Sequence, residues 1–428
     1  ALAFETPLRN KTILKNIYQL GSGEKMSISK NGEIIISKYW KWDINDNYFS
    51  SLSFEKCVDI ACEMFDKNMR KLKINGNKLL LPLSGGYDSR LIAILAIRHL
   101  HKDKIHPVTY CYSKISREYI YANKISKNLS LNGHQFHQLS SQSYLQALDW
   151  MVKETGGLVS FSNVHLLDYL RSSSGIEGIL SSGFSDALCG FEAHSEKKLP
   201  YSTWEKSNMV LRWKGFSKEY KISHHIDDET MNDLEILSKA WFESNITSFD
   251  EYLYIIERHA KFHLPLLNLW RKYSPVMNPF ISSDLIKLFF SMPPKFRFNK
   301  TLEKGVIQRF SPDVASIKSM SSLVIYGRTG NKVDRLLNRG INFTNMILRS
   351  IGFAQLEISS PRITEQLSKA MHTFLKTDYT RSVSQLYYMD IFNSQQAKKM
   401  KKISLRVDNK LSFQLHALNC AATYRLKR

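Results

Sequence analysis

The sequence is poor in cysteine, with five among its 428 residues, scattered from Cys57 to Cys420. That spacing fits neither a disulfide framework nor a zinc cluster. We therefore expect reduced, buried or half-buried thiols, as in a cytoplasmic protein. Long apolar runs are also missing, because no window holds 18 consecutive apolar residues. We expect no transmembrane helix.

Acidic residues are in the minority, with 39 Asp and Glu against 60 Lys and Arg, so the formal net charge is +21. A field of this sign favours anionic partners such as nucleotides, nucleic acids, acidic substrates or a membrane surface. A solvated, lysine-rich surface accounts for such an excess equally well, and we do not expect nucleic acid as a partner. Hydrophobic residues make up 43% of the chain and charged residues 23%. This usage excludes a wholly disordered or fibrous protein, and the length allows two or three domains.

The amino-terminal region contains only short extended pieces. The chain begins Ala1-Leu2-Ala3 and shows no signal-peptide pattern. Residues 33–37, Glu-Ile-Ile-Ile-Ser, are predicted to be extended and follow a turn signal at residues 30–32. Residues 1–48 are too short to fold alone, so we expect them to be the tail of one domain or a lead-in packed on the next.

Strand and helix patterns alternate over the next part of the chain. An amphipathic stripe at residues 53–73 predicts a helix, and the apolar run at 78–83 predicts a buried strand. The pattern continues with helices at 88–102, 118–129 and about 144–152, and with strands at 105–111, 134–139 and 176–180. This order predicts an α/β fold, a parallel sheet with helices on both faces. Beyond about residue 200 the chain becomes helical and loop-rich, with helical spacing at 250–272 and 283–291.

The most informative stretch is residues 83–90, Leu-Ser-Gly-Gly-Tyr-Asp-Ser-Arg, between a predicted strand and a predicted helix. Small residues let backbone N–H groups approach an anion, and a helix amino terminus adds a favourable partial charge. The hydroxyls of Ser84 and Ser89 can donate to phosphate oxygens. Asp88, itself an anion, suits a magnesium ion that bridges phosphates. The stretch predicts a pyrophosphate cradle at the carboxyl end of a strand.

This loop lacks the lysine of P-loop kinases and GTPases. It matches instead the Ser-Gly-Gly-x-Asp-Ser loop of the ATP-pyrophosphatase superfamily, and the chain resembles the asparagine synthetase family, with its relatives the β-lactam synthetases and lasso-peptide cyclases. Three other stretches carry the resemblance, at residues 17–40, 116–118 and 180–190. Weaker similarities lie at 278–281 and 292–294.

The resemblance implies three regions. Residues 1–48 would be the remnant of an amino-terminal amidotransferase-like domain with its linker. Residues 49–330 would be an ATP-pyrophosphatase domain with an adenine nucleotide alpha hydrolase-like sheet. Residues 331–428 would form a basic, mainly helical extension.

The family adenylates a carboxylate with ATP and Mg²⁺, releases pyrophosphate, and lets ammonia or an amine displace AMP. Carried over to this sequence, the two nucleotide-binding loops contain Leu83, Ser84, Gly85, Gly86, Asp88 and Ser89, and Ser181, Ser182 and Gly183. The pyrophosphate would lie on the first loop, and the nucleotide and the acyl-adenylate beside the second. Asp88 and Asp186 would share magnesium.

Several positions depart from the family's pattern. Gly183 and Phe184 stand where members place a glutamate or a tyrosine, and Ala187 stands where asparagine synthetases have a glutamate. Members also carry a lysine that stabilises the leaving pyrophosphate. Lys318 lies about two positions too early for this role, and Lys304 is the alternative. Without a clear base, amine deprotonation falls to another group or to the substrate.

The substrates stay open. Complete family enzymes obtain ammonia from glutamine with an amino-terminal cysteine, and no cysteine precedes Cys57 here. Glutamine hydrolysis would thus need a missing segment or a partner chain. The carboxylate substrate would be aspartate or, on family analogy, a uronic-acid sugar or a peptide side chain. Two other functions remain, an RNA-modifying member of the same superfamily and a non-catalytic nucleotide-binding homologue.

Other charged groups favour structural interpretations. Residues 224–229, His-His-Ile-Asp-Asp-Glu, are expected to form a solvated loop rather than a metal site. His134 and His137 lie on a predicted strand and would point to opposite faces. Glu118 is either functional or a carboxylate that stabilises a helix amino terminus.

Overall fold

The computed structural model describes residues 4–319, apart from residues 5, 13–15, 41, 43–46, 73, 75, 112–113, 115, 139–149, 151–153, 156–164, 191–192, 194–196 and 221–222. Most of the helix expected at 144–152 and the whole extension expected at 331–428 lie outside these residues. The prediction of a helical extension is therefore untested.

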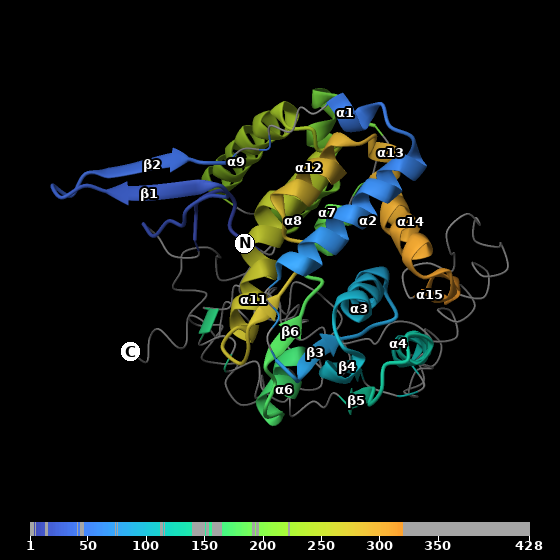
Figure 1. Ribbon diagram of the computed structural model, residues 1–428. Coiled ribbons are helices and arrows are strands. Elements are labelled where there is room, and N and C mark those ends of the chain that lie inside the picture. The colour runs from blue at the N-terminus through green and yellow to red at the C-terminus, as the bar shows by residue number, and fades with distance from the viewer. Residues whose placement is uncertain are drawn as a thin grey trace, which may run out of the picture.

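The amino-terminal region forms a hairpin. Strand β1 (Glu24–Ile28) pairs with β2 (Ile34–Lys38) in an antiparallel register that sets Met26 opposite Ile36. The hairpin projects from the body of the molecule, at the left of Figure 1. Extended structure in residues 33–37 was predicted, and it is confirmed.

The main sheet has five strands, all paired in parallel, in the order β5-β4-β3-β6-β7. Their bounds are β3 Leu79–Pro82, β4 Ile105–Cys111, β5 Gln135–Gln138, β6 Gly178–Leu180 and β7 Val276–Met277. The central strands β3 and β6 are almost wholly buried, as expected for a parallel sheet covered by helices. The predicted fold class is confirmed.

The chain order reverses beside the central strand β3. After β3 the chain adds β4 and then β5 on one side, and it returns to place β6 on the other side. In register, Leu79 of β3 faces both Ile105 of β4 and Gly178 of β6. Open α/β sheets bind ligands at such a reversal, outside the carboxyl ends of the strands. The loops that follow β3 and β6 are therefore neighbours.

Three helices form one packed group. These are α2 (Phe54–Lys71), α3 (Tyr87–His99) and α14 (Thr301–Phe310), each in contact with the other two. The predicted stripe of α2 is buried, including Phe65, and Ser53 caps the helix by accepting from the N–H of Lys56. The helix predicted from apolar residues at a period of about 3.6 is therefore confirmed as α2.

Other helices lie against the sheet from elsewhere. Helix α4 (Arg117–Asn128) and helix α6 (His165–Ser172) each contact β4, and α6 also contacts α11 (Leu264–Trp270). In the view of Figure 1, α3 lies above β3 and β4 and α6 lies below them. The helices therefore cover both faces of the sheet.

The expectation of a loop at residues 224–229 was wrong. These residues are the first turns of helix α9 (His224–Glu243). Asp227 lies in its first turn, where a negative charge stabilises a helix. Farther along α9, Leu234 and Trp241 are buried. The first turn of α9 is polar and has no apolar spacing. The apolar spacing farther along the helix, and its burial, explain why the segment is helical.

The helical spacing at 250–272 corresponds to three consecutive segments. Helix α10 (Phe249–Leu253) runs into the π-helical segment η4 (Tyr254–His263), which continues as α11. Both this prediction and that of α12 (Ser283–Ser291) are confirmed. The π-helical turn matters because such turns are rare and often occur at functional sites.

The remaining helices connect these parts. They are α1 (Asn47–Ser50), η1 (Lys102–Lys104), α7 (Ser185–Cys189), η3 (Tyr201–Lys206), α8 (Asn208–Tyr220), α13 (Pro294–Arg297), η5 (Phe298–Lys300) and α15 (Pro312–Ser316). The four cysteines within the described residues are buried and free, as expected. No helix in the described part of the chain is long and apolar enough to cross a membrane.

Candidate active site

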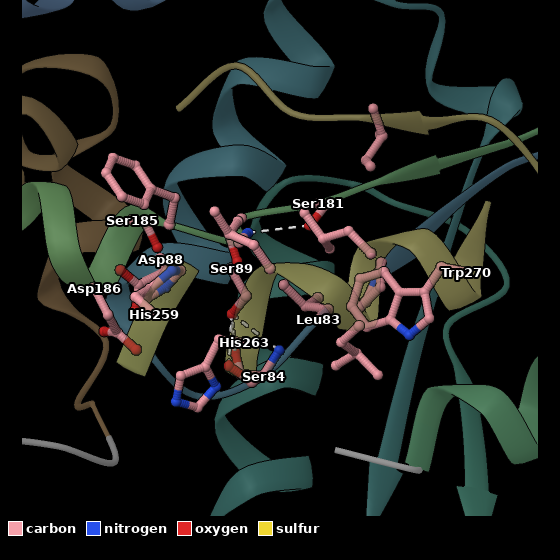
Figure 2. A pocket seen from close by; sticks show the side chains of 18 of the residues that line it. Leu83, Ser84, Asp88, Ser89, Ser181, Ser185, Asp186, His259, His263 and Trp270 are labelled. Atoms are coloured by element: carbon pink, nitrogen blue, oxygen red, sulfur yellow. Dashed lines mark hydrogen bonds between the residues drawn. The ribbon is translucent and has the colours of Figure 1, made fainter. Parts of the chain in front are cut away.

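A cavity of about 360 Å³ opens at the carboxyl ends of β3 and β6. Most of its lining comes from the loop after β3, the loop after β6, and the face of η4 and α11 (Figure 2), and Thr109 and Tyr110 of β4 and Glu118 of α4 add to it. Its described lining includes Leu83, Ser84, Asp88, Ser89, Ser181, Ser182, Gly183 and Asp186. Of the residues expected at the nucleotide, only Gly85 and Gly86 are missing from this lining, and both belong to the first loop.

Hydroxyl groups organise the first loop. Ser84 Oγ and Ser89 Oγ lie 2.7 Å apart, and the N–H groups of Ser84 and Gly86 donate to Ser89 Oγ and Ser84 Oγ at 3.0 and 3.1 Å. Helix α3 then begins at Tyr87, with no side chain capping its amino terminus. Its first-turn N–H groups and the helix dipole favour an anion at this end.

The loop already binds a carboxylate. Glu118, near the amino terminus of α4, accepts a hydrogen bond of 3.3 Å from the N–H of Gly85. Burial raises the pKa of Glu118, and its hydrogen bonds with the loop oppose this effect only in part. The contact shows that an oxyanion fits against the loop. Glu118 lies in the first turn of α4 and also lines the cavity, so its functional role stays a prediction.

The second loop is held close to α11. The N–H of Gly183 donates to Ser181 Oγ at 3.0 Å, and Asn278 donates to the Gly183 carbonyl at 2.6 Å. A Cβ at position 183 would lie 3.2 Å from Ser181 Oγ and 3.3 Å from a methyl group of Leu267. Glycine is thus favoured there by close packing. The next residue, Phe184, has a φ of 79°, a conformation that a bulky residue adopts only under strain.

A lysine that the motif analysis did not single out joins the two loops. Lys300 Nζ lies 2.7 Å from Asp88 Oδ1 and 2.6 Å from Asp186 Oδ1. Its third carboxyl neighbour is Glu303, at 3.6 Å. The Lys300 side chain is only 8% exposed and that of Glu303 is fully buried. In the sequence, the one signal was that Lys300 stands three residues before Glu303. This spacing is too common in helices to identify a functional lysine.

These groups shift one another's pKa values. Burial opposes ionisation of Asp88, but attraction to Lys300 outweighs it and lowers the pKa of Asp88. Burial and the charge of Asp88 raise the pKa of Asp186 to about 6. Burial and the same charge raise the pKa of Glu303 well above its usual value. Three acidic side chains therefore surround the single ammonium group of Lys300.

Asp88 and Asp186 are the acidic side chains that a Mg²⁺ ion would contact in this cluster. Within the described residues, no group of three or more His, Cys, Asp or Glu side chains could hold a metal ion alone. Magnesium is commonly held by one or two carboxylates together with substrate phosphates. Asp88 and Asp186 supply that number at the cavity wall, and their net charge with Lys300 stays negative. The residues therefore fit a magnesium ion carried by a polyphosphate.

The comparisons with known proteins agree with this geometry. Residues 65–263 match the asparagine synthase family model. The segment contains both loops, Asp88, Asp186 and η4. Over this segment the resemblance to the asparagine synthase family inferred from the motifs is confirmed.

Other comparisons are distant. Among solved structures, the NH3-dependent NAD synthetase from Campylobacter jejuni subsp. jejuni NCTC 11168, in complex with the nitrate ion, shows 19% sequence identity and a TM-score of 0.22. The match covers 33% of this chain and 62% of that chain, so it spans less than two thirds of that synthetase. The search of curated proteins finds no match.

Neither lysine expected to bind pyrophosphate is among the residues that line the cavity. Lys304 donates to the Asn299 carbonyl at 2.6 Å and lies over the Tyr87 ring. Lys318 is exposed, and its carbonyl accepts a hydrogen bond from the buried Arg90. Their contact with pyrophosphate stays a prediction. The cation that the structure places beside both aspartates is Lys300.

Two histidines of η4 complete the cavity, and motif analysis missed them because they lie outside any recognised pattern. His259 is buried and lies edge-on to Phe184, with ring centroids 5.2 Å apart. Burial and the neighbouring Arg258 lower the pKa of His259 to about 4 and that of His263 to about 3. Both rings are therefore neutral at pH 7 and can exchange hydrogen bonds with a ligand.

The histidines expected on the strand at 134–139 make separate structural contacts. His134 lies 2.8 Å from the Thr109 hydroxyl, and His137 lies 2.7 Å from Asp168 of α6. Thr109 in turn donates to the Leu83 carbonyl at 2.7 Å, just before the first loop. His134 thus supports the loop indirectly.

Proposed function

We propose that this protein is an ATP-dependent carbon–nitrogen ligase that forms AMP. It would adenylate a carboxylate, release pyrophosphate, and transfer ammonia or an amine to the acyl group to give an amide and AMP. One observation carries the proposal: two loops from adjacent central strands, with Asp88 and Asp186, converge on one cavity in a domain of the asparagine synthase family.

The first loop is suited to the phosphates. The backbone N–H groups of the loop and of the first turn of α3, together with the paired hydroxyls of Ser84 and Ser89, offer donors to phosphate oxygens. Glu118 occupies one of these donors, the N–H of Gly85, and would have to release it. Asp88 and Asp186 would hold Mg²⁺, which neutralises phosphate charge when bound.

In the adenylation step, a carboxylate oxygen attacks the α-phosphorus of ATP and the bond to the bridging oxygen of pyrophosphate breaks. In the second step, the amine nitrogen attacks the acyl carbon and the bond to the AMP oxygen breaks. Lys300 is the cation nearest to both aspartates, so we propose that it balances charge on this side of the cavity. The amine would be ammonia from glutamine or another donor.

A non-catalytic nucleotide-binding role is the second candidate. The observation that favours it is the position of Lys300, whose ammonium group already bridges the two carboxylates proposed for magnesium. In that case the protein would bind ATP without any need for Mg²⁺. The two candidates differ in whether pyrophosphate is released.

The test is pyrophosphate release from ATP and Mg²⁺ over a panel of carboxylates, with ammonium present. Asp88→Asn removes a proposed magnesium ligand, and we expect it to lower the rate by a factor of about 100 or more. Asp103→Asn is the matched control, because Asp103 is exposed on η1, away from the cavity lining. ATP binding without release by any carboxylate would favour the non-catalytic role. Equal rates for Asp88→Asn and the control would contradict the proposed magnesium site.

A further inference from the structure

The part of the cavity beyond the two loops is apolar. It is lined by the η4–α11 face and by the second loop, with side chains of Phe184, Tyr254, Leu264, Leu266, Leu267 and Trp270. Leu266 and Leu267 are 6% and 4% exposed. In the view of Figure 2, Trp270 lies at one end of the cavity and Asp186 at the other. An acyl group that reaches from the loops toward Trp270 would therefore be surrounded by hydrocarbon.

Positive charge is missing from this wall. Among the described residues that line the cavity, none is a lysine or an arginine, and His259 and His263 are neutral at pH 7. The charged residues of the lining are the acidic Asp88, Glu118 and Asp186, all at the loop end. A substrate with a second carboxylate would bury that charge without a cation, which is strongly unfavourable. A substrate ammonium group would compete with magnesium for the same aspartates.

Neutral polar side chains interrupt the apolar wall, among them His259 and Trp270. His259 Nδ1 and Trp270 Nε1 are buried and have no hydrogen-bond partner. The two residues are 5% and 9% exposed, and they come from neighbouring segments, η4 and α11. A buried polar atom without a partner is costly, and the indole N–H can only donate. An uncharged acceptor atom of a ligand would satisfy Trp270 Nε1, and His259 Nδ1 would pair with an uncharged acceptor or donor according to its tautomer.

From these observations we infer that the acyl substrate is a hydrophobic carboxylic acid that carries no charge besides the reacting carboxylate. Neutral polar atoms of this acid, such as amide or ether oxygens, would meet His259 and Trp270. The inference rests on the proposed function and names its substrate class. It excludes aspartate and disfavours a uronic-acid sugar, whose hydroxyls would face leucine side chains.

The experiment compares two series of acids in carboxylate-dependent exchange of labelled pyrophosphate into ATP, with Mg²⁺ and no amine. The first series is hydrophobic, with N-acetylphenylalanine, indole-3-acetate and 4-phenylbutyrate. The second is charged or strongly polar, with aspartate, glutamate and glucuronate. We expect the best hydrophobic acid to exceed every member of the second series by a factor of about 100 or more in kcat/KM.

Variants of α11 test where the acid binds. Trp270→Phe keeps an aromatic side chain, although a smaller one, and removes the N–H, so we expect KM for N-acetylphenylalanine to rise about 10-fold while KM for ATP stays unchanged. Leu264→Lys adds a cation to the half-buried wall and should shift preference toward aspartate by about 10-fold or more. Asn268→Lys is its matched control, because Asn268 is exposed on the same helix and does not line the cavity.

The outcomes separate this inference from the proposed function. Exchange driven best by aspartate, glutamate or glucuronate would overturn the inference and leave the proposed function standing. Equal effects of Leu264→Lys and Asn268→Lys on acid preference would also overturn it. Measurable ATP binding with no exchange by either series would refute the proposed function, and the inference with it. Circular dichroism of each variant confirms that a loss is not due to unfolding.

Discussion

Lys300 donates hydrogen bonds to both carboxylate oxygens of Asp88, each at 2.7 Å, across 212 positions of sequence. Lys300 itself adopts a left-handed backbone, with a φ of 58°, and so does Asn299 before it. Strained residues of this kind persist only where surrounding structure holds them in place. The interaction binds the start of α14 to the start of α3, and through Asp186 to the second loop.

The first prediction concerns the loss of this cation. Lys300→Met would leave Asp88 and Asp186 without their buried counter-ion, and we expect it to reduce the free energy of unfolding by about 3 kcal/mol. Urea denaturation measures this change. Millimolar Mg²⁺ should stabilise the variant more than the native protein, because the two aspartates are then open to another cation. An unchanged urea midpoint would show that the ion pair does not stabilise the fold.

The second prediction concerns the carboxylate that occupies the first loop. Glu118 accepts from the Gly85 N–H, and its charge would repel a bound phosphate. We therefore expect Glu118→Gln to strengthen ATP binding in the absence of Mg²⁺ by about three- to tenfold. Calorimetric titration with ATP in EDTA measures this affinity. Weaker binding would instead indicate that Glu118 shapes the loop in a way that an amide cannot replace.

The third prediction concerns a buried arginine that connects the first loop to the end of the described chain. Arg90 is fully buried and donates to the carbonyl oxygens of Gly85, Val314, Ile317 and Lys318. A lysine cannot reproduce this planar set of donors. Arg90→Lys should therefore lower the free energy of unfolding by about 2–4 kcal/mol. Arg98→Lys, at a partly exposed site on the same helix, should cost about 1 kcal/mol or less by urea denaturation.

The fourth prediction concerns pH. Burial lowers the pKa of His259 to about 4 and that of His263 to about 3, whereas an unfolded histidine titrates near 6.5. Between pH 6.5 and 4 the unfolded chain therefore binds more protons than the folded one. Stability from these groups is complete above about pH 6.5 and is lost as the pH falls through that interval.

Each of these two histidines adds a slope of at most about 1.4 kcal/mol per pH unit to the stability profile. His259→Asn should flatten the profile between pH 6 and 4.5, measured from urea midpoints. The control is His101→Asn, because His101 is exposed. A profile with the native slope in His259→Asn would mean that His259 is not buried in its neutral form.

Local sequence patterns predicted much of the fold. The apolar spacing of α2 and the apolar run of β3 each depend on residues near one another in sequence, so periodicity is enough to recognise them. The helix at 224–243 was missed because its polar first turn has no apolar spacing, and burial of Trp241 comes five turns later. Contact with the rest of the domain, rather than local preference, made this segment helical.

By itself, the sequence determined the alternation of strands and helices, the first loop with Ser84 and Asp88, the second loop with Asp186, and the family of residues 65–263. Only the tertiary structure decided that β3 and β6 are neighbours, that Lys300 bridges the two aspartates, and that η4 closes the cavity with His259. The physical reason is the separation in sequence of the residues that interact. Loops and helices follow from nearby residues, whereas ion pairs and cavity walls join residues far apart, and their formation depends on the packing of the whole domain.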